Sequence, residues 1–266
     1  MFSKILKTII PSEQHKSEFE MLLKKAQTMP RFVPTTISFE QYKLHIPDLI
    51  SVVYQLEEFM ISKKFEFNTV NDDVPVIYDC GANVGVASIF FSKRFPNAVI
   101  KAFEPDPKII PYLKENLFVN GIENVRVFEE AVWVDNNGLE FGSEGADGGS
   151  IYFPSNKIRV NTVRLKDKLS EDGNISFLKL DIEGAEESVL KDCENELHKV
   201  KYLFVEYHSW KERKQKLSEL LSVLENNNFR YNIESLPNKG NYYSGNNCDN
   251  RNMDLQLNIY AVNKSI

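Results

Sequence analysis

A short set of glycine and polar residues has the types and spacing needed to bind a nucleotide. Directly after the apolar residues 76–78 come Asp79, Gly81, Asn83 and Gly85. Glycine lacks a Cβ, so a turn with two glycines approaches a ligand closely and adopts positive φ. Glu104 lies 25 positions after Asp79, close to the offset of about 20 residues expected of an acid that hydrogen-bonds ribose hydroxyls. The spacing predicts a pocket for an adenosine-containing cofactor.

The acid before the first glycine helps to choose the cofactor. A dinucleotide fold favours G-x-G-x-x-G, whose third glycine helps the helix pack close to the strand, but this turn reads D-x-G-A-N-x-G from Asp79 to Gly85. An acid there would repel a pyrophosphate and suits a cationic amino group, which S-adenosylmethionine carries. The pattern predicts S-adenosylmethionine. An NAD-dependent Rossmann enzyme is the alternative.

Each turn residue has a predicted contact and a plainer structural explanation. Asp79 would hold the cofactor amino group directly or through water, or would only order the turn. Asn83 and Gly85 would meet the methionine carboxylate with a side-chain amide and a backbone N–H, or would only cap the following helix. Gly81 allows close approach of the backbone. Glu104 is assigned to the ribose, and Glu130 or Ala131 to the adenine ring.

Candidate catalytic groups follow two later apolar strands. Asp181 and Glu183 come after LKL, and Glu206 and His208 come after LFV. A sugar hydroxyl is a weak nucleophile near pH 7, so a base in hydrogen-bond reach would speed methyl transfer. His208 is the predicted base by its intrinsic pKa. Asp181 and Glu206 would orient it or bind the acceptor hydroxyl, and Asp181 also adjoins the cofactor.

A metal site is the competing interpretation of the same carboxylates. Asp181 and Glu206 would then be oxygen ligands of a Mg²⁺-type ion that lowers the pKa of the acceptor hydroxyl. Two carboxylates after separate strands are also common without a metal. The residue pattern therefore favours a site with no metal ligands.

Four segments together resemble the FkbM-type methyltransferases. They are DCGANVGVAS, AFEPDP, EEAVW at 129–133 and FLKLDIEGAEESVL at 177–190. The resemblance covers about residues 50–210, with LKLDIEGAE its most specific part. It implies a class I methyltransferase fold, S-adenosylmethionine as donor, and an oxygen acceptor on a sugar or other natural product. The acceptor itself is not inherited with the fold.

Strands and helices alternate along the chain, which predicts a doubly wound, mostly parallel, Rossmann-like α/β sheet. An antiparallel hairpin is expected at its end. The expected strands cover residues 75–79, 98–104, 124–130, 158–163, 175–181, 200–206, 229–236 and 254–262. The expected helices cover residues 86–94, 107–119, 164–169, 184–196 and 210–227.

The first part of the chain is expected to form a mainly helical cap, residues 1–70, ahead of an S-adenosylmethionine-binding domain, residues 71–266. The cap would contain a helix over 12–28, a strand over SFEQYKLHI at 38–46, and a helix that opens at Asp48. It would lean over the cofactor edge, and its alternative role is a homodimer contact.

Composition excludes several classes of protein. The net charge is −6, with basic residues interleaved with acids, whereas nucleic-acid-binding surfaces usually show a basic stripe. Three widely separated cysteines have neither metal-ligand spacing nor a disulfide framework, which predicts a reducing, cytoplasmic location. No stretch approaches the apolar length of a membrane span.

Two loops are candidates for the acceptor site. Gly148, Gly149 and Ser150 would pack near the cofactor or the acceptor, and Tyr242 and Tyr243 in the loop 236–254 would stack on a sugar. The leading hypothesis is an O-methyltransferase acting on a glycan or small-molecule hydroxyl. Besides the NAD-dependent enzyme, the other alternative is a non-catalytic cofactor-binding module with the same fold.

Overall fold

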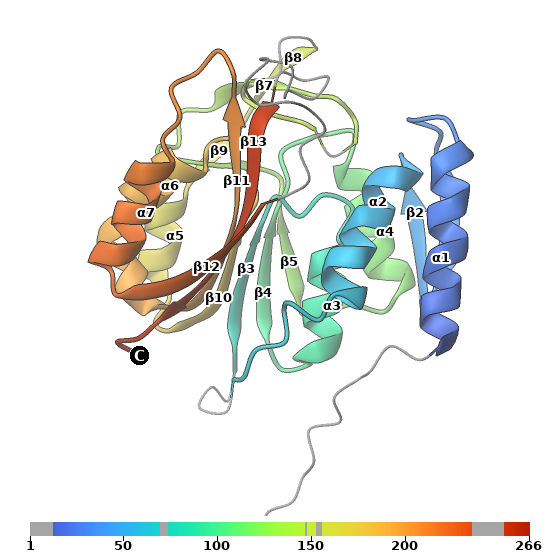
Figure 1. The fold of residues 1–266 in the computed structure, drawn as a ribbon, viewed down its shortest axis with the longest axis horizontal. Coiled ribbons are helices and arrows are strands. Elements are labelled where there is room, and N and C mark those ends of the chain that lie inside the picture. The colour runs from blue at the N-terminus through green and yellow to red at the C-terminus, as the bar shows by residue number, and fades with distance from the viewer. Residues whose placement is uncertain (1–12, 70–73, 147, 153–155, 236–252) are drawn as a thin grey trace, which may run out of the picture.

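The computed structural model describes residues 13–69, 74–146, 148–152, 156–235 and 253–266. Its centre is a seven-stranded sheet in the order β12-β13-β11-β10-β3-β4-β5 (Figure 1). The strands are β3 (Val76–Cys80), β4 (Val99–Phe103), β5 (Val125–Phe128), β10 (Ile175–Leu180), β11 (Val200–Trp210), β12 (Phe229–Ser235) and β13 (Met253–Asn263).

Strand direction confirms the expected sheet. From β5 to β11 every neighbouring pair is parallel, and β13 is antiparallel to both β11 and β12. The parallel strands therefore end at one edge, and the turn after β3 lies beside the residues that follow β4 and β10.

Helices cover both faces of the sheet (Figure 1). On one face lie α3 (Val86–Arg94) and α4 (Ile110–Val119), and on the other α5 (Leu165–Glu171), α6 (Glu186–Asp192) and α7 (Leu217–Asn226). Side chains alternate along β3. Ile77 packs in the core between the sheet and α3 and α4, and Tyr78 packs in the core between the sheet and α5, α6 and α7. This is the period-two burial of a strand covered on both sides.

The N-terminal segment packs against the α3 and α4 side. It contains α1 (Glu13–Thr28), β1 (Thr35–Phe39), β2 (Tyr42–Ile46), α2 (Leu49–Leu56) and the π-helical turn η1 (Glu57–Ile61). Asn116 of α4 ties β2 down, because its side chain accepts from His45 N and donates to His45 O, at 2.7 and 3.0 Å. Asp48 caps α2 as expected, accepting from Ser51 N at 3.2 Å.

Several predicted boundaries were wrong. The strand expected over 38–46 is a hairpin, because the chain turns at Glu40, whose φ is +51°. Strand 124–130 ends at Phe128, and strand 158–163 is divided between two small sheets. These pair β6 (Ala131–Trp133) with β9 (Thr162–Arg164), and β7 (Leu139–Gly142) with β8 (Lys157–Val160).

Two predicted helices also differ. The helix expected over 210–227 begins only at Leu217, because β11 stays paired with β13 as far as Trp210. The helix expected over 184–196 is α6 followed by the 3₁₀ segment η2 (Glu194–Lys199). Tyr242 and Tyr243 lie outside the described residues. Within the part of the chain that the structure describes, no helix has the length and apolarity to cross a membrane.

Candidate active site

The turn between β3 and α3 requires both of its glycines. Gly81 and Gly85 have φ of +84° and +93°. A Cβ on Gly81 would lie 1.8 Å from the carbonyl oxygen of Asp181, and one on Gly85 would lie 2.8 Å from Leu113 Cδ1. A side chain at Gly81 would therefore displace the backbone that follows β10.

The backbone donors of this turn are used within the fold. Gly81 N and Ala82 N donate to Phe103 O at 3.0 and 2.9 Å, and Gly85 N donates to Ala82 O at 2.9 Å. The Gly85 N–H predicted to meet a methionine carboxylate thus already has an acceptor. These bonds hold the turn against β4.

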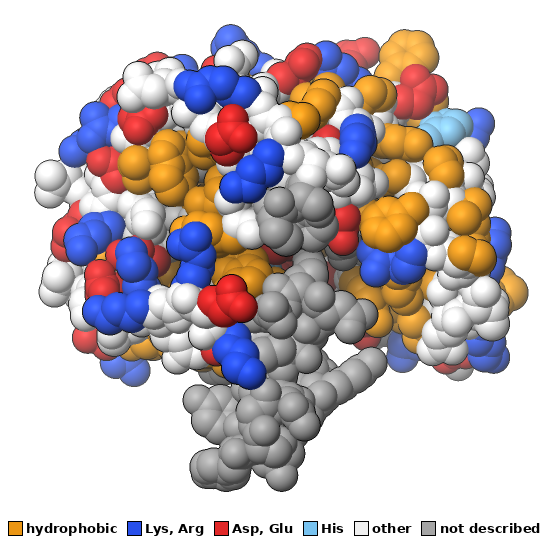
Figure 2. All heavy atoms as spheres, turned by 90° about the horizontal axis from the view of Figure 1, so that it is seen from above, with side chains coloured by type: hydrophobic (Ala, Val, Ile, Leu, Met, Phe, Trp, Pro, Cys, Tyr) orange, Lys and Arg blue, Asp and Glu red, His pale blue; other side chains and the backbone are white. Residues whose placement is uncertain are grey.

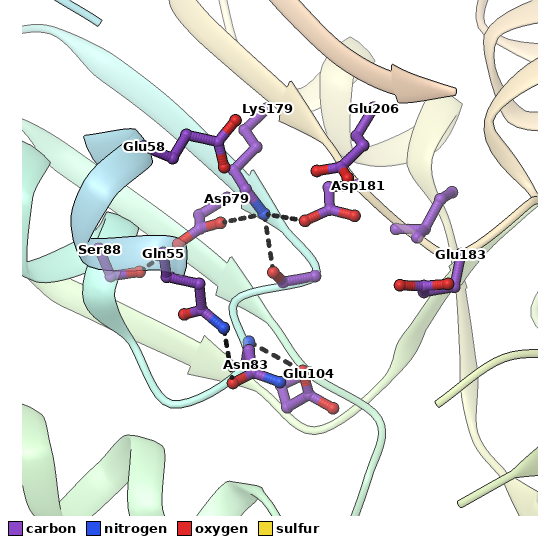
Figure 3. Close-up of polar contacts among 12 residues, drawn as sticks. Gln55, Glu58, Asp79, Asn83, Ser88, Glu104, Lys179, Asp181, Glu183 and Glu206 are labelled. Atoms are coloured by element: carbon purple, nitrogen blue, oxygen red, sulfur yellow. Dashed lines mark hydrogen bonds and ion pairs between the residues drawn. The ribbon is translucent and has the colours of Figure 1, made fainter. Parts of the chain in front are cut away.

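Asn83 connects three parts of the chain, as Figure 3 shows in part. Its φ is +49°. Its Oδ1 accepts from Gln55 Nε2 of α2 at 3.1 Å, and its Nδ2 donates to Ala146 O at 2.8 Å. The amide predicted to bind the cofactor therefore joins the turn to the N-terminal segment and to the excursion after β7.

Glu104 is buried beside the turn (Figure 3). Its two oxygens accept from Asn83 N at 2.9 Å and from Asp106 N at 2.8 Å. Burial raises the pKa of Glu104 to about 7, although the two backbone donors oppose the shift. The predicted ribose ligand thus lies against the glycine turn, as the sequence spacing required.

Asp79 faces protein groups. Ser88 Oγ donates to its Oδ2 at 2.6 Å, and the Lys179 ammonium lies 3.3 Å from its Oδ1. The Asp79 side chain is fully buried. This geometry favours the explanation in which Asp79 orders the turn.

Lys179 was missed by the sequence analysis. Its ammonium donates to Gly81 O at 2.8 Å and lies 3.2 Å from Asp181 Oδ2 (Figure 3). Burial alone would lower its pKa, but Asp181 and Asp79 raise it above its ordinary value. The available signal was a lysine inside the apolar strand ISFLKL, because a buried charge needs a partner.

His208 lies within β11 and is surrounded by glutamates. Its side chain is fully buried, with Nδ1 3.0 Å from Glu186 Oε1. Its Nε2 is 3.6 Å from Glu206 Oε1 and 3.8 Å from Glu183 Oε1. Burial opposes protonation, but the charges of Glu183 and Glu186 raise the pKa of His208 well above its usual value. The imidazolium form is therefore favoured at neutral pH.

The neighbouring carboxylates respond differently to burial. Burial raises the pKa of Asp181 to about 6. The positive charge of Lys179 opposes this shift, and the negative charge of Glu206 adds to it. For Glu206 the effect of burial is outweighed by His208 and by Gln256, which donates to Glu206 Oε1, so its pKa is lowered.

Glu58 of η1 is a further carboxylate that sequence reasoning missed (Figure 3). Burial, followed by the charges of Glu206 and Asp181, raises its pKa to about 8. Asn258 Nδ2 of β13 donates to its Oε1 at 3.0 Å. Its position in the N-terminal segment gave no sign that it would lie at the edge of the sheet.

Three of these residues have the geometry of a cation site. One ligand atom each from Asp181, Glu206 and His208 lie within 4.8 Å of one another. Carboxylate oxygens and an imidazole nitrogen are common ligands of divalent metals. The arrangement thus permits the metal alternative as well as proton transfer without a metal.

The remaining predicted residues lie farther along the same edge. Glu104 N donates to Phe128 O at 3.0 Å, so the stretch leading to Glu130 begins beside Glu104. Ala131 N donates to Asn161 O at 2.9 Å in the β6–β9 pair. Among the described residues, neither Glu130 nor Ala131 makes a hydrogen bond or ion pair with the glycine turn, so their adenine role stays a prediction.

The excursion after β7 reaches the edge as well. Ser150 Oγ donates to Glu183 O at 2.6 Å, and Ala146 O accepts from Asn83. Gly149 lies against the Phe141 ring, where a Cβ would approach Cζ to 2.7 Å. Ser150 thus contacts the Asp181–Glu183 segment, while Gly149 packs within its own small sheet.

Comparisons with known proteins identify the family of this chain. A family model described as the methyltransferase FkbM domain matches residues 79–231. The 2-O-methyltransferase NoeI of Sinorhizobium fredii is 32% identical in an alignment 155 residues long that covers 50% of this chain and 63% of that protein. Methyltransferase sdnD of Sordaria araneosa is 31% identical in an alignment 170 residues long that covers 46% of this chain and 61% of that protein. The chain thus spans less than two thirds of either relative.

A solved structure supports the fold. The S-adenosylmethionine-dependent methyltransferase from Agrobacterium tumefaciens aligns with a TM-score of 0.50 at 10% identity, covering 89% of this chain and 72% of that one. At this identity the likeness concerns the fold alone. It confirms the class I methyltransferase architecture expected from the sequence.

Proposed function

This chain belongs to the FkbM methyltransferase family, and we propose that it is an S-adenosylmethionine-dependent O-methyltransferase acting on a hydroxyl of a glycan or small molecule. One observation carries the proposal: the turn 81–85 and Glu104 lie at the same sheet edge as Asp181 and Glu206. The similarity to NoeI, named as a 2-O-methyltransferase, supports an oxygen acceptor.

The residues of the turn fit the proposed cofactor. Gly81 lets the backbone after β10 pack directly on the turn, where a Cβ would lie 1.8 Å from Asp181 O. Each oxygen of Glu104 accepts one backbone N–H and would accept a further hydrogen bond from a ribose hydroxyl. Asn83 would approach the methionine carboxylate, and Glu130 or Ala131 the adenine. When bound, S-adenosylmethionine would supply a methyl group carried on a sulfonium: as the acceptor oxygen bonds to the methyl carbon, the carbon–sulfur bond breaks and the neutral thioether S-adenosylhomocysteine is released.

The N-terminal 70 residues complete this pocket in our proposal. The bond between Gln55 and Asn83 and the position of Glu58 near Asp181 and Glu206 support a cap that contributes polar groups to the cofactor edge. Residues 71–266 would form the methyltransferase domain.

We propose that Asp181 is the base that receives the proton of the acceptor hydroxyl. A base must be unprotonated, and the glutamates around His208 favour its imidazolium. With a pKa of about 6, Asp181 is ionised at pH 7 and still basic enough to be useful. His208 then serves as a fixed positive charge between Glu206 and Glu183. This differs from the base role predicted for His208 from its intrinsic pKa.

A divalent cation on Asp181, Glu206 and His208 would lower the hydroxyl pKa by a different route. Turnover before and after treatment with EDTA separates the two routes. Unchanged turnover supports proton transfer to Asp181, and a loss restored by Mg²⁺ supports the metal.

Isothermal titration with S-adenosylhomocysteine tests the proposal, with NADH as the control ligand. Micromolar binding of S-adenosylhomocysteine alone is the expected result. Binding of NADH instead, or of neither ligand, contradicts the proposal. Tight binding of S-adenosylhomocysteine without methyl transfer to a broad panel of sugars and phenols would favour the non-catalytic module.

A further inference from the structure

A cavity of about 510 Å³ lies beside His208. Its walls come from the start of α6, the end of β11, the segment that joins β11 to α7, and Tyr152. Its volume is typical of small-molecule sites. Seen from above, the half of the molecule over α5–α7 shows a group of apolar side chains bordered by both basic and acidic side chains (Figure 2).

Two aromatic rings form a fixed wall of this cavity. Tyr152 and Trp210 make an edge-to-face contact with ring centroids 5.2 Å apart. A Cβ on Gly184, whose φ is +100°, would lie 2.1 Å from Trp210 Cζ3. The glycine therefore lets the indole pack directly on the backbone after β10. A rigid aromatic surface of this kind suits the apolar C–H face of a sugar ring.

One cation on the cavity wall keeps its charge available. Lys216 is paired with Glu187 at 2.8 Å, and Lys214 lies 3.7 Å from Glu219. Arg213 has its guanidinium carbon 3.6 Å from the centre of the Tyr152 ring, and no described carboxylate lies within ion-pair distance of it. A stacked guanidinium is well suited to binding a carboxylate, phosphate or sulfate.

We propose that this cavity binds the acceptor and that the acceptor is an anionic saccharide, a sugar that carries a carboxylate, phosphate or sulfate group. The sugar ring packs on Trp210 and the anionic group binds Arg213. This inference rests on the proposed function. His208 lines the cavity and its Nε2 lies 3.6 Å from Glu206, so an acceptor hydroxyl at that wall would be separated from the proposed reaction centre by one side chain.

Charge fixes the orientation of such an acceptor. Arg213, Lys214 and Lys216 outnumber Glu187 and Glu212 in the cavity wall, so an anionic group is attracted there. Glu183 and Glu206 lie behind His208 and repel it, so the neutral hydroxyl is the end expected to face His208. Opposite charges at the two ends of a binding site select orientation more than they add affinity. A neutral sugar lacks this restraint.

Tryptophan fluorescence tests the proposal without measuring activity. The chain has two tryptophans, Trp133 and Trp210, so Trp133→Phe leaves Trp210 as the only one. Glucose 6-phosphate and glucuronic acid are titrated with and without S-adenosylhomocysteine, with glucose as the neutral control. Saturable quenching by the anionic sugars is expected, with affinity at least about tenfold above that for glucose, the effect of one charge-assisted contact.

Arginine variants identify the anion site. Arg213→Gln should lower affinity for both anionic sugars about tenfold and leave glucose unchanged. Arg94→Gln is the matched control, because Arg94 also stacks on a ring, that of Phe95 at 5.4 Å, at the C-terminal end of α3. Calorimetry of the unmodified chain with the same sugars repeats the comparison if Trp133→Phe does not fold.

Several results would overturn the inference. They are equal quenching by glucose and the anionic sugars, no quenching by any of them, and unchanged discrimination in Arg213→Gln. Binding of S-adenosylhomocysteine without sugar binding contradicts this inference alone. Sugar binding without S-adenosylhomocysteine contradicts the proposed function instead.

Discussion

The turn after β3 and the ends of β10 and β11 lie at the same edge of the sheet, but their charges are balanced differently. At the turn, Asn83, Glu104 and Asp79 each contact protein partners. At the strand ends carboxylates outnumber the cations Lys179 and His208 that contact them. These carboxylates are Asp181, Glu183, Glu186 and Glu206, beside Glu58, whose pKa of about 8 keeps it mostly protonated at pH 7.

This difference indicates two ways of preparing a site. Protein hydrogen bonds shape the turn in advance, which lowers the cost of ordering it around a ligand. The strand ends carry more negative than positive charge. Burial makes this excess charge unfavourable in free energy unless a positively charged group binds beside it. We therefore expect substitutions at the turn to change stability and cofactor affinity, and substitutions at the strand ends to change rate.

Asp181→Asn should have the largest effect. It removes the proposed proton acceptor and should lower kcat by about 10²–10⁴-fold, with little change in the affinity for S-adenosylhomocysteine. In the unsubstituted chain kcat/KM should rise with pH up to about 6 and then level, because the Asp181 carboxylate must be ionised. Rate–pH profiles with an acceptor from the panel check both points. A profile still rising above pH 7 would return the base role to His208.

Lys179→Met removes the ammonium that joins the two regions. It leaves the Asp79 carboxylate buried without a cation and should lower the free energy of unfolding by about 3–5 kcal/mol. Urea denaturation measures the loss. Lys191→Met, at an exposed pair, should change stability by less than about 0.5 kcal/mol. Adding Asp79→Asn to Lys179→Met should recover part of the loss, and no recovery would argue against the pairing.

Gly81→Ala tests whether the turn is shaped in advance. The new Cβ meets the carbonyl oxygen of Asp181 at a positive φ, so a loss of about 3 kcal/mol of stability is expected. Calorimetry should also show loss of S-adenosylhomocysteine binding. Gly173→Ala is the matched control, since a Cβ there meets nothing within 4 Å. Similar behaviour of the two variants would remove the steric argument.

Glu104→Ala should have the smallest effect of the four in free energy. Loss of the proposed ribose acceptor should weaken S-adenosylhomocysteine binding by more than about tenfold, or about 1.4 kcal/mol, while the fold persists. The ionised form of Glu104 is a better hydrogen-bond acceptor than the protonated form, and the pKa of Glu104 is about 7. The affinity of the unsubstituted chain for S-adenosylhomocysteine should therefore fall as the pH is lowered through 7. Titrations at several pH values check this. Equal affinity in the variant would remove the ribose assignment.

The sequence allowed most of the sheet to be predicted, because glycines and apolar runs marked each strand and turn. The end of β11 was harder. Residues 211–216 carry the charge pattern of an exposed helix, and the strand that extends β11 to Trp210 is contributed by distant residues of β13. Pairing with a strand far along the chain overrode the local pattern.

The candidate site was also only partly predictable, because some of its contacts come from residues far apart in the sequence. Glu104 and Asp181 could be placed because motif spacing and strand ends fix them. Lys179, Gln55 and Glu58 could not, because their roles depend on partners brought together only by the fold. The charge state of His208 likewise depends on Glu183 and Glu186, so its intrinsic pKa was a poor guide to its chemistry.

The position of β13 between β11 and β12 has a consequence for the biogenesis of the protein. Synthesis from the N-terminus makes β11 and β12 before the strand that joins them. Until β13 inserts, both strands present unpaired edges, which are prone to associate with other chains. Gln256, which holds Glu206, arrives with that last strand. We therefore expect a nascent chain to form the glycine turn before the proposed reaction centre is complete, and to be most vulnerable to aggregation in between.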